Sequence, residues 1–133
     1  MKRKEARETM ASVFYQMDIR SGFPDEKLDV FIDRGKMGNQ YEYCVKLFGL
    51  YRTNLKDADA LISKYSRRWN INRMAKMDLA ILRLAVFEIM EFEDIPDAVS
   101  ANEAVELAKK YGTDNAPKFI NAILGSILRS EKK

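Results

Sequence analysis

The side chains of this sequence that could do chemistry are mostly basic and aromatic, and the first of them lie near the N terminus. Residues 2–7 carry four basic residues and one acid. On a helix, Arg3 and Arg7 would lie four residues apart on one face, with Lys4 beside them. Lysine and arginine neutralise phosphates, and arginine also stacks on unpaired bases. The cluster predicts RNA binding. The alternative is a solvated helix start, although cations oppose the helix dipole at this end.

Two further features could contact bases. An exposed Tyr15, about one turn past the basic face, could stack on a base, and the alternative is a partly buried core tyrosine. The turn at residues 112–119 is expected to place Asn115, Lys118 and Phe119 at a surface corner between two helices. Packing considerations alone favour an ordinary turn with Phe119 in the core.

Groups that support catalysis are scarce. The chain has no histidine, the commonest general base and metal ligand. Cys44, the only cysteine, lies in an apolar helical run and is interpreted as a small core residue rather than a reactive thiol. Glu103 and Glu106 could share a helix face as catalytic carboxylates do, but lysines follow them and no histidine is available. We therefore expect a protein that is not an enzyme and holds no cofactor or metal.

The net charge of +3 is modest, but the charges are segregated. Residues 64–76 contain five basic residues and no acid, whereas residues 88–97 contain five acids and no base. The acidic segment supports a rival interpretation, an adaptor that docks a basic protein without binding RNA. No stretch approaches the ~18 uncharged apolar residues of a membrane helix. With a single cysteine, this predicts a cytoplasmic chain that does not cross a membrane.

Apolar residues recur at helical spacing throughout, and no strand pattern or repeat appears. The segment 77–92 is apolar on nearly all sides and predicts a central, buried helix. Gly49, inside a predicted helix, suggests that another helix approaches closely there. The expected fold is all-α, a compact domain over residues 1–133. Its seven helical segments are expected at residues 2–19, 25–34, 39–55, 56–66, 77–92, 96–111 and from Pro117 onward.

The order of these features resembles the N-utilisation substance B (NusB) family. The resemblance rests on a basic run followed by Phe14-Tyr15-Gln16, on an Asp-Leu-Ala-Ile-Leu-Arg-Leu-Ala-Val-Phe-Glu stretch at 78–88, and on Asp-Ile-Pro at 94–96. It continues with Asn-Glu-Ala-Val-Glu-Leu-Ala-Lys-Lys-Tyr-Gly at 102–112 and Lys-Phe-Ile-Asn at 118–121. Each match is weak alone, but their order and spacing from near residue 3 to near residue 128 are specific.

The resemblance implies a helical fold of two packed subdomains, each built around three helices. It implies a transcription antitermination factor that binds boxA, a short single-stranded element of nascent RNA. It also implies a partner, the ribosomal protein NusE, and joint action on elongating RNA polymerase, notably on ribosomal RNA operons. Some members dimerise over their RNA surface, so a homodimer stays open. A related alternative is the RNA-interacting NusB-like domain of ribosomal RNA methyltransferases, but this chain lacks their glycine-rich cofactor loop.

By position, the resemblance also implies two sets of site residues. The RNA-binding set is Arg3, Lys4, Arg7, Tyr15, Asn115, Lys118 and Phe119. The partner-binding set is Asp78, Arg83 and Glu88. For Phe119, resemblance and packing disagree, and the expectation follows the resemblance.

The sequence departs from the family pattern at several positions. Asn115 stands where aspartate is frequent, Ala122 where glycine is usual, Gly125 where an acid is common and Ala101 where a larger apolar residue is usual. No departure removes a basic residue. The change at Asn115 removes a negative charge beside the implied RNA path, which should strengthen binding.

Overall fold

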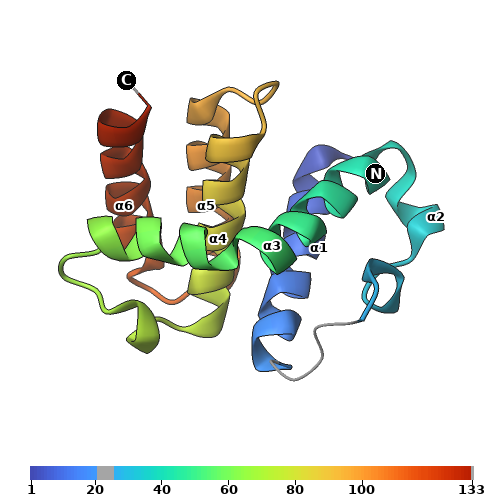
Figure 1. The fold of residues 1–133 in the computed structure, drawn as a ribbon, viewed down its shortest axis with the longest axis horizontal. Coiled ribbons are helices and arrows are strands. Elements are labelled where there is room, and N and C mark those ends of the chain that lie inside the picture. Colours follow the sequence, from blue (N-terminus) through green and yellow to red (C-terminus); the bar gives the residue numbers. More distant parts are fainter. Residues whose placement is uncertain (21–25, 133) are drawn as a thin grey trace.

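The computed structural model describes residues 1–20 and 26–132, and their regular structure is entirely helical (Figure 1). The α-helices are α1 (Arg3–Ile19), α2 (Arg34–Met37), α3 (Tyr41–Tyr65), α4 (Lys76–Glu91), α5 (Asp97–Tyr111) and α6 (Ala116–Glu131). Short 3-10 turns occur at Leu28–Val30, Gly38–Gln40 and Ile71–Arg73. No strand occurs in these two ranges, so the predicted all-α class is confirmed. None of the described helices is long and apolar enough to cross a membrane.

The helices form two groups. Figure 1 shows α4, α5 and α6 together on one side, α1 and α2 on the other, and α3 running across both. The central helix is α4, which packs against α1, α3, α5 and α6. All of its residues from Asp78 to Ile89 are buried, as its all-round apolar pattern predicts.

A single helix, α3, replaces the two helices expected at 39–55 and 56–66. It kinks at Asn54, whose φ of −121° and ψ of 15° are not helical. No proline or turn sequence separates the two halves, and buried residues continue on the same helix through Tyr51, Ala58 and Ile62. The boundary was thus expected in nearly the right place, but the chain bends there instead of stopping. The bend lets one helix cover both groups.

The segment expected as a helix at 25–34 contains only a short 3-10 turn, Leu28–Val30, in its described residues. Its first residue, 25, lies outside the described residues, and the α-helix α2 begins only at Arg34. Asp33 starts α2 by accepting a hydrogen bond from the backbone N–H of Gly35 at 2.9 Å. The cap accounts for the start of α2 at Arg34, nine residues later than expected.

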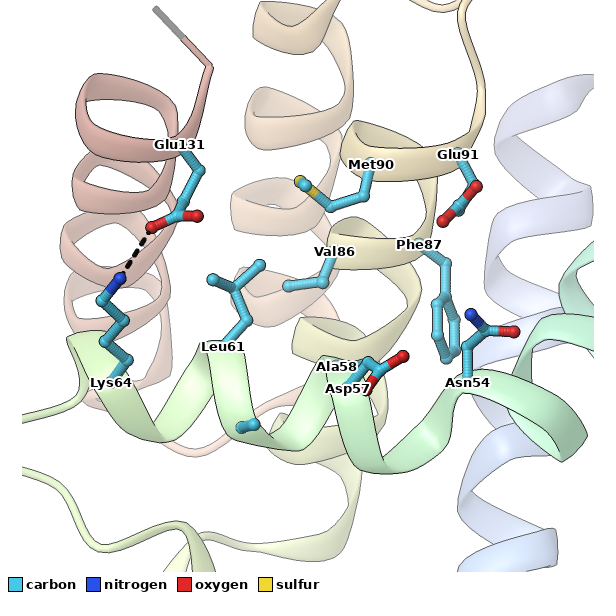
Figure 2. Close-up of a pocket in the computed structure, with 11 residues that line it drawn as sticks. Asn54, Asp57, Ala58, Leu61, Lys64, Val86, Phe87, Met90, Glu91 and Glu131 are labelled. Atoms are coloured by element: carbon cyan, nitrogen blue, oxygen red, sulfur yellow. Dashed lines mark hydrogen bonds and ion pairs between the residues drawn. The ribbon is translucent and has the colours of Figure 1, made fainter.

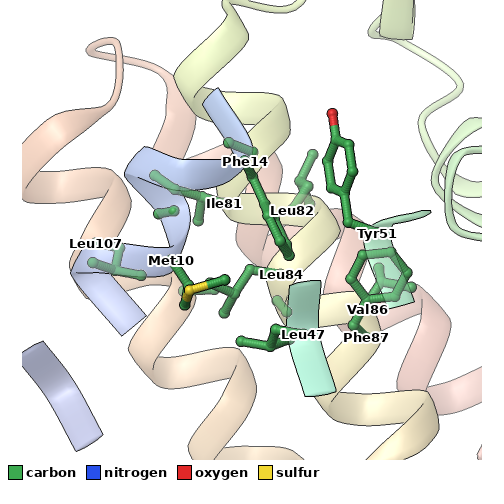
Figure 3. Packing of buried hydrophobic residues seen from close by; sticks show 14 of the residues in the cluster. Met10, Phe14, Leu47, Tyr51, Ile81, Leu82, Leu84, Val86, Phe87 and Leu107 are labelled. Carbon is green, nitrogen blue, oxygen red and sulfur yellow. The ribbon is translucent and has the colours of Figure 1, made fainter. Parts of the chain in front are cut away.

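The core is centred on Phe14, which is fully buried between α3 and α4 (Figure 3). Its ring centroid lies 4.7 Å from that of Tyr51 and 5.8 Å from that of Phe87, the latter in an edge-on arrangement. Cys44 is also fully buried, and burial raises the pKa of its thiol to about 11. The interpretation of Cys44 as a core residue is therefore confirmed.

Two glycines behave differently from each other. Gly112 ends α5 as predicted, but its backbone is extended, with φ −88° and ψ 179°. A Cβ atom at Gly112 would lie 2.7 Å from Oδ1 of Asp78 and 2.8 Å from the carbonyl oxygen of Ala108, so only glycine fits. Gly49 is exposed, and a Cβ there would have no neighbour within 4 Å. The expectation that a helix approaches Gly49 closely is wrong.

These two environments predict opposite effects of the same substitution. Gly49→Ala should raise the free energy of unfolding by about 0.5–1 kcal/mol, because alanine restricts the unfolded chain and favours the helix. Gly112→Ala should lower it by about 1–3 kcal/mol, because its methyl group would overlap Asp78 and Ala108. Urea unfolding followed by circular dichroism measures both. A destabilised Gly49→Ala variant would show that α3 is constrained at Gly49 by something other than packing.

Candidate nucleic-acid interface

The basic start of α1 lies on the surface, and its residues differ in exposure. Lys4 is exposed, whereas Arg3 is half-buried. The Arg3 guanidinium lies over the ring of Tyr43, 4.2 Å from its centroid, and its Nε donates to Oε1 of Gln40. Glu5 accepts a hydrogen bond from the backbone N–H of Lys2 at 3.1 Å, which supplies an acid at the helix start. The carboxylate of Glu5 therefore offsets part of the unfavourable interaction between the cations of this turn and the helix dipole.

Arg7 does not lie on this surface. Only 5% of the residue is exposed, and its Nε and Nη2 donate to the two carboxylate oxygens of Glu88 at 2.8 Å and 3.0 Å. Burial opposes the charge of Arg7, but the hydrogen bonds and charge of Glu88 outweigh it and raise the pKa of the guanidinium. The expectation that Arg7 contacts RNA is corrected, because a phosphate cannot reach a group enclosed in this way.

Glu88 is the centre of a buried polar network. It has no exposed surface, and besides Arg7 it accepts hydrogen bonds from the hydroxyls of Tyr43 and of Ser100, the latter at 2.8 Å. Burial and the charge of Glu88 raise the pKa of Tyr43 far above its ordinary value, so the phenol stays a proton donor. The network joins α1, α3, α4 and α5. Glu88 therefore cannot be a direct partner contact, and that expectation is corrected.

Arg83 is buried on another side of α4. Its Nε and Nη2 donate to the carboxylate of Asp59 at 2.8 Å and 2.7 Å, and its Nη1 donates to the hydroxyl of Tyr51 at 3.2 Å. The same Nη1 lies 3.5 Å from the carboxylate of Asp18 on α1. Arg83 thus ties α1 and the second half of α3 to α4, and the expected partner contact through its side chain is corrected.

Asp78 is the third buried charge of α4, with 1% of the residue exposed. Its carboxylate accepts hydrogen bonds from the backbone N–H of Thr113 at 3.0 Å and from the Thr113 hydroxyl at 2.6 Å. The expectation of a direct partner contact is corrected here too. Asp78 fixes the turn between α5 and α6, and it can approach so closely because Gly112 has no side chain.

The turn held by Asp78 carries the second part of the expected RNA site. Asn115 and Lys118 are exposed there. Phe119 is only 6% exposed, and its ring centroid lies 5.5 Å from that of Trp69. Its ring lies mainly in the core, as packing considerations favoured, but it also lines the hollow beside Asn115, so its contact with RNA stays a prediction. Tyr15 is half-buried against the core, between the two alternatives stated for it.

Helix α1 contacts the end of α5 through Glu8. Glu8 accepts hydrogen bonds from the hydroxyl of Tyr111 at 2.6 Å and from Nζ of Lys110 at 3.2 Å. The hydrogen bond from Tyr111, more than the interaction with Lys110, lowers the pKa of Glu8 and keeps the carboxylate charged. This contact holds the second turn of α1 beside the end of α5, and Lys4, one turn earlier, lines a hollow with Glu103 and Glu106 of α5.

Basic residues that the sequence analysis did not assign to the site lie next to this corner. Arg68, Trp69 and Arg73 line a hollow together with Thr113 and Asn115. The sequence signal was available, because residues 64–76 contain five basic residues, no acid and the only tryptophan. What the sequence did not reveal was that the α3–α4 loop folds back against α6.

A second, mainly apolar groove lies elsewhere, between α3, α4 and the end of α6 (Figure 2). Leu61, Val86 and Met90 point into it, with the acids Asp57 and Glu91 at its rim. Its lining contains no histidine or cysteine. Across residues 1–20 and 26–132, no group of three or more histidine, cysteine or acidic side chains is placed to hold a metal ion.

The fold and these surfaces define a class, a helical binding protein whose exposed basic corner is held in place by buried charges. The NusB family model matches residues 4–129, so this chain belongs to the NusB family. The transcription antitermination protein NusB of Alkaliphilus oremlandii is 43% identical over 132 residues, covering 98% of this chain and 96% of the relative. The protein of the same name from Pelotomaculum thermopropionicum is 40% identical over 134 residues, covering 100% and 93%. Because the family consists of transcription antitermination factors, the expectation that the chain is not an enzyme is confirmed.

Solved structures agree with this assignment. T. maritima NusB has a TM-score of 0.87 at 33% identity, covering 98% of this chain and 92% of that one. A structure of the antitermination factors NusB and NusE in complex with dsRNA has a TM-score of 0.82 at 29% identity, covering 96% of each chain.

The buried network predicts that Arg7 acts on stability. Arg7→Ala would leave the charge of Glu88 without its guanidinium partner and should lower the free energy of unfolding by about 3–5 kcal/mol. Lys4→Ala, one turn earlier and exposed, should change it by less than about 0.5 kcal/mol. Urea unfolding of both variants at neutral pH makes the comparison. Equal, small effects would mean that Arg7 does not support the core.

Proposed function

We propose that this chain is a cytoplasmic transcription antitermination factor that binds single-stranded boxA RNA together with the ribosomal protein NusE. It would promote processive transcription as part of an RNA polymerase complex, notably on ribosomal RNA operons, with residues 1–133 acting as one RNA-binding unit. The observation that carries the proposal is the exposure of Lys4 on α1 and of Asn115 and Lys118 at the α5–α6 turn in a chain of the NusB family. The similarity to a NusB crystallised with NusE and RNA supports it.

Recognition would combine charge and stacking. Lys4 and Lys118 are exposed and would neutralise phosphates, while Arg3, Tyr15 and Asn115 would contact unpaired bases. The hydrogen bonds of Glu8 to Lys110 and Tyr111 would hold α1 against the end of α5 before RNA binds. Less conformational entropy is then lost on binding, because the two parts of the surface are already joined.

Partner binding would depend on the buried charges of α4 indirectly. Asp78, Arg83 and Glu88 are enclosed, so they would shape the surface for NusE by holding helices and the α5–α6 turn. A homodimer over the basic corner would compete with RNA for the same residues.

One observation favours a second function, protein docking without RNA. The groove of Figure 2 is apolar inside and carries Asp57 and Glu91 at its rim, close to the acidic segment 88–97. A basic partner with an apolar side chain would fit it. If this function is correct, reversing the charges of Asp57 and Glu91 should abolish binding of the protein partner. The chain should then bind boxA RNA no better than a scrambled RNA.

The proposed function can be tested by fluorescence anisotropy of a labelled boxA RNA, against a scrambled RNA, with and without NusE. Wild type should prefer boxA, and NusE should increase the preference. The double variant Lys4→Ala/Lys118→Ala should bind boxA about tenfold more weakly, since two phosphates lose their partners. The slope of log affinity against log salt concentration should become shallower by about 1.4. The control Arg34→Ala/Lys36→Ala removes the same charge from exposed residues of α2. Equal weak binding to both RNAs, unchanged by NusE, would contradict the proposal and favour docking.

Asn115 provides a finer test of the same corner. Asn115→Asp adds a negative charge at an exposed position beside the proposed RNA path and should weaken boxA binding by about twofold to fivefold. Asn39→Asp adds the same charge at an exposed position far along the sequence, between α2 and α3, and should have little effect. Equal affinity of the wild type and Asn115→Asp would place residue 115 outside the RNA path.

A further inference from the structure

A hollow of about 580 Å³ lies between the α3–α4 loop and α6. Its lining includes Tyr65, Arg67, Arg68, Trp69, Lys118 and Arg129. These residues come from two segments far apart in sequence, residues 65–69 and helix α6, so the hollow exists only in the folded chain.

The positive charge of this hollow is largely unpaired. Among the ion pairs that residues 1–20 and 26–132 form with one another, none involves Arg67, Arg68, Lys118 or Arg129. Arg129 donates only to the hydroxyl of Ser126, at 3.3 Å. The nearby acid Glu131 is already engaged by Lys64, at 3.0 Å, and by the hydroxyl of Tyr65. An anionic ligand would therefore meet arginines that have no competing carboxylate.

An aromatic side chain lies among these cations. Trp69 is partly exposed and lines both this hollow and the neighbouring one that contains Arg73 and Asn115. Phe119 supports its ring from the core side, at 5.5 Å between centroids. An aromatic ring flanked by arginines is the combination that binds single-stranded nucleic acid, because bases stack on the ring while phosphates contact the cations.

The hollow is continuous with the corner described above. Lys118 belongs to both, and Trp69 shares the neighbouring hollow with Asn115. We propose that this hollow is a second RNA subsite, which takes nucleotides flanking those bound at α1 and the α5–α6 turn. Arg67, Arg68 and Arg129 hold their phosphates and Trp69 stacks on a base. This inference rests on the proposed function, since it extends the same RNA path.

The first test uses Trp69 as its own reporter, because it is the only tryptophan of the chain. A short boxA RNA is compared with the same RNA extended by about six nucleotides at either end. One extension should raise the affinity about tenfold and quench the Trp69 fluorescence. An extension of abasic nucleotides should keep the phosphate contacts but should not quench the Trp69 fluorescence, because it has no base to stack on the ring. Identical fluorescence with abasic and natural extensions would overturn the stacking on Trp69.

Two variants test the cations without disturbing the core. Arg67→Ala/Arg68→Ala removes exposed side chains. Gly125→Glu places an acid beside Arg129, since a Cβ at Gly125 would lie 3.1 Å from Nη1 of Arg129, and it replaces a residue of low helix propensity. Both should bind the short RNA within about twofold of wild type yet lose most of the gain from the extension. Arg34→Ala/Lys36→Ala on α2 is the charge-matched control for the double variant.

The outcomes separate the two proposals. Failure of the wild type to prefer the short boxA RNA over a scrambled one would remove the proposed function, and the subsite with it. A clear preference for boxA, with no gain from either extension, would overturn the subsite alone. The subsite would also be overturned if Arg67→Ala/Arg68→Ala lost no more of the affinity gained from the extension than the control Arg34→Ala/Lys36→Ala.

Discussion

The structure depends most on the buried carboxylate of Glu88. A charge without any exposed surface is costly, and it is tolerated because Arg7, Tyr43 and Ser100 all donate hydrogen bonds to it. These donors come from three different helices that surround α4. The helices must therefore meet α4 in one register, since any slip would leave the charge without a partner. The apolar core around Phe14 supplies the bulk of the burial, and the network selects the arrangement.

The other buried charges of α4 fix the positions of segments that reach the surface. Arg83 joins α1 and α3 through Asp18 and Asp59, while Asp78 holds the backbone and hydroxyl of Thr113. The turn that bears Asn115 and Lys118 is thereby fixed relative to the central helix. Such fixed geometry lowers the conformational entropy that a surface loses when it binds a ligand.

Charge is divided between two surfaces. Exposed basic residues gather around the α3–α4 loop and α6, as they also do elsewhere on the surface, whereas Asp57 and Glu91 lie at the rim of the apolar groove between α3, α4 and α6. The positive surface favours an anionic ligand, whereas the groove is mainly apolar with acids at its rim. The net charge of +3 therefore conceals two surfaces of different character.

The sequence by itself determined the helical class, the central position of the 77–92 segment, the lack of histidine and, through ordered motifs, the family. These follow from local periodicity and composition, which do not require knowledge of long-range contacts. It also located the basic α1 start and the α5–α6 turn. The tertiary structure alone decided which charged residues face outward. Arg7 and Lys4 look alike in the sequence, but only Arg7 meets a buried acid 81 residues away. Likewise, Phe119 became a core residue and Arg67 and Arg68 joined the basic surface, because the α3–α4 loop packs against α6.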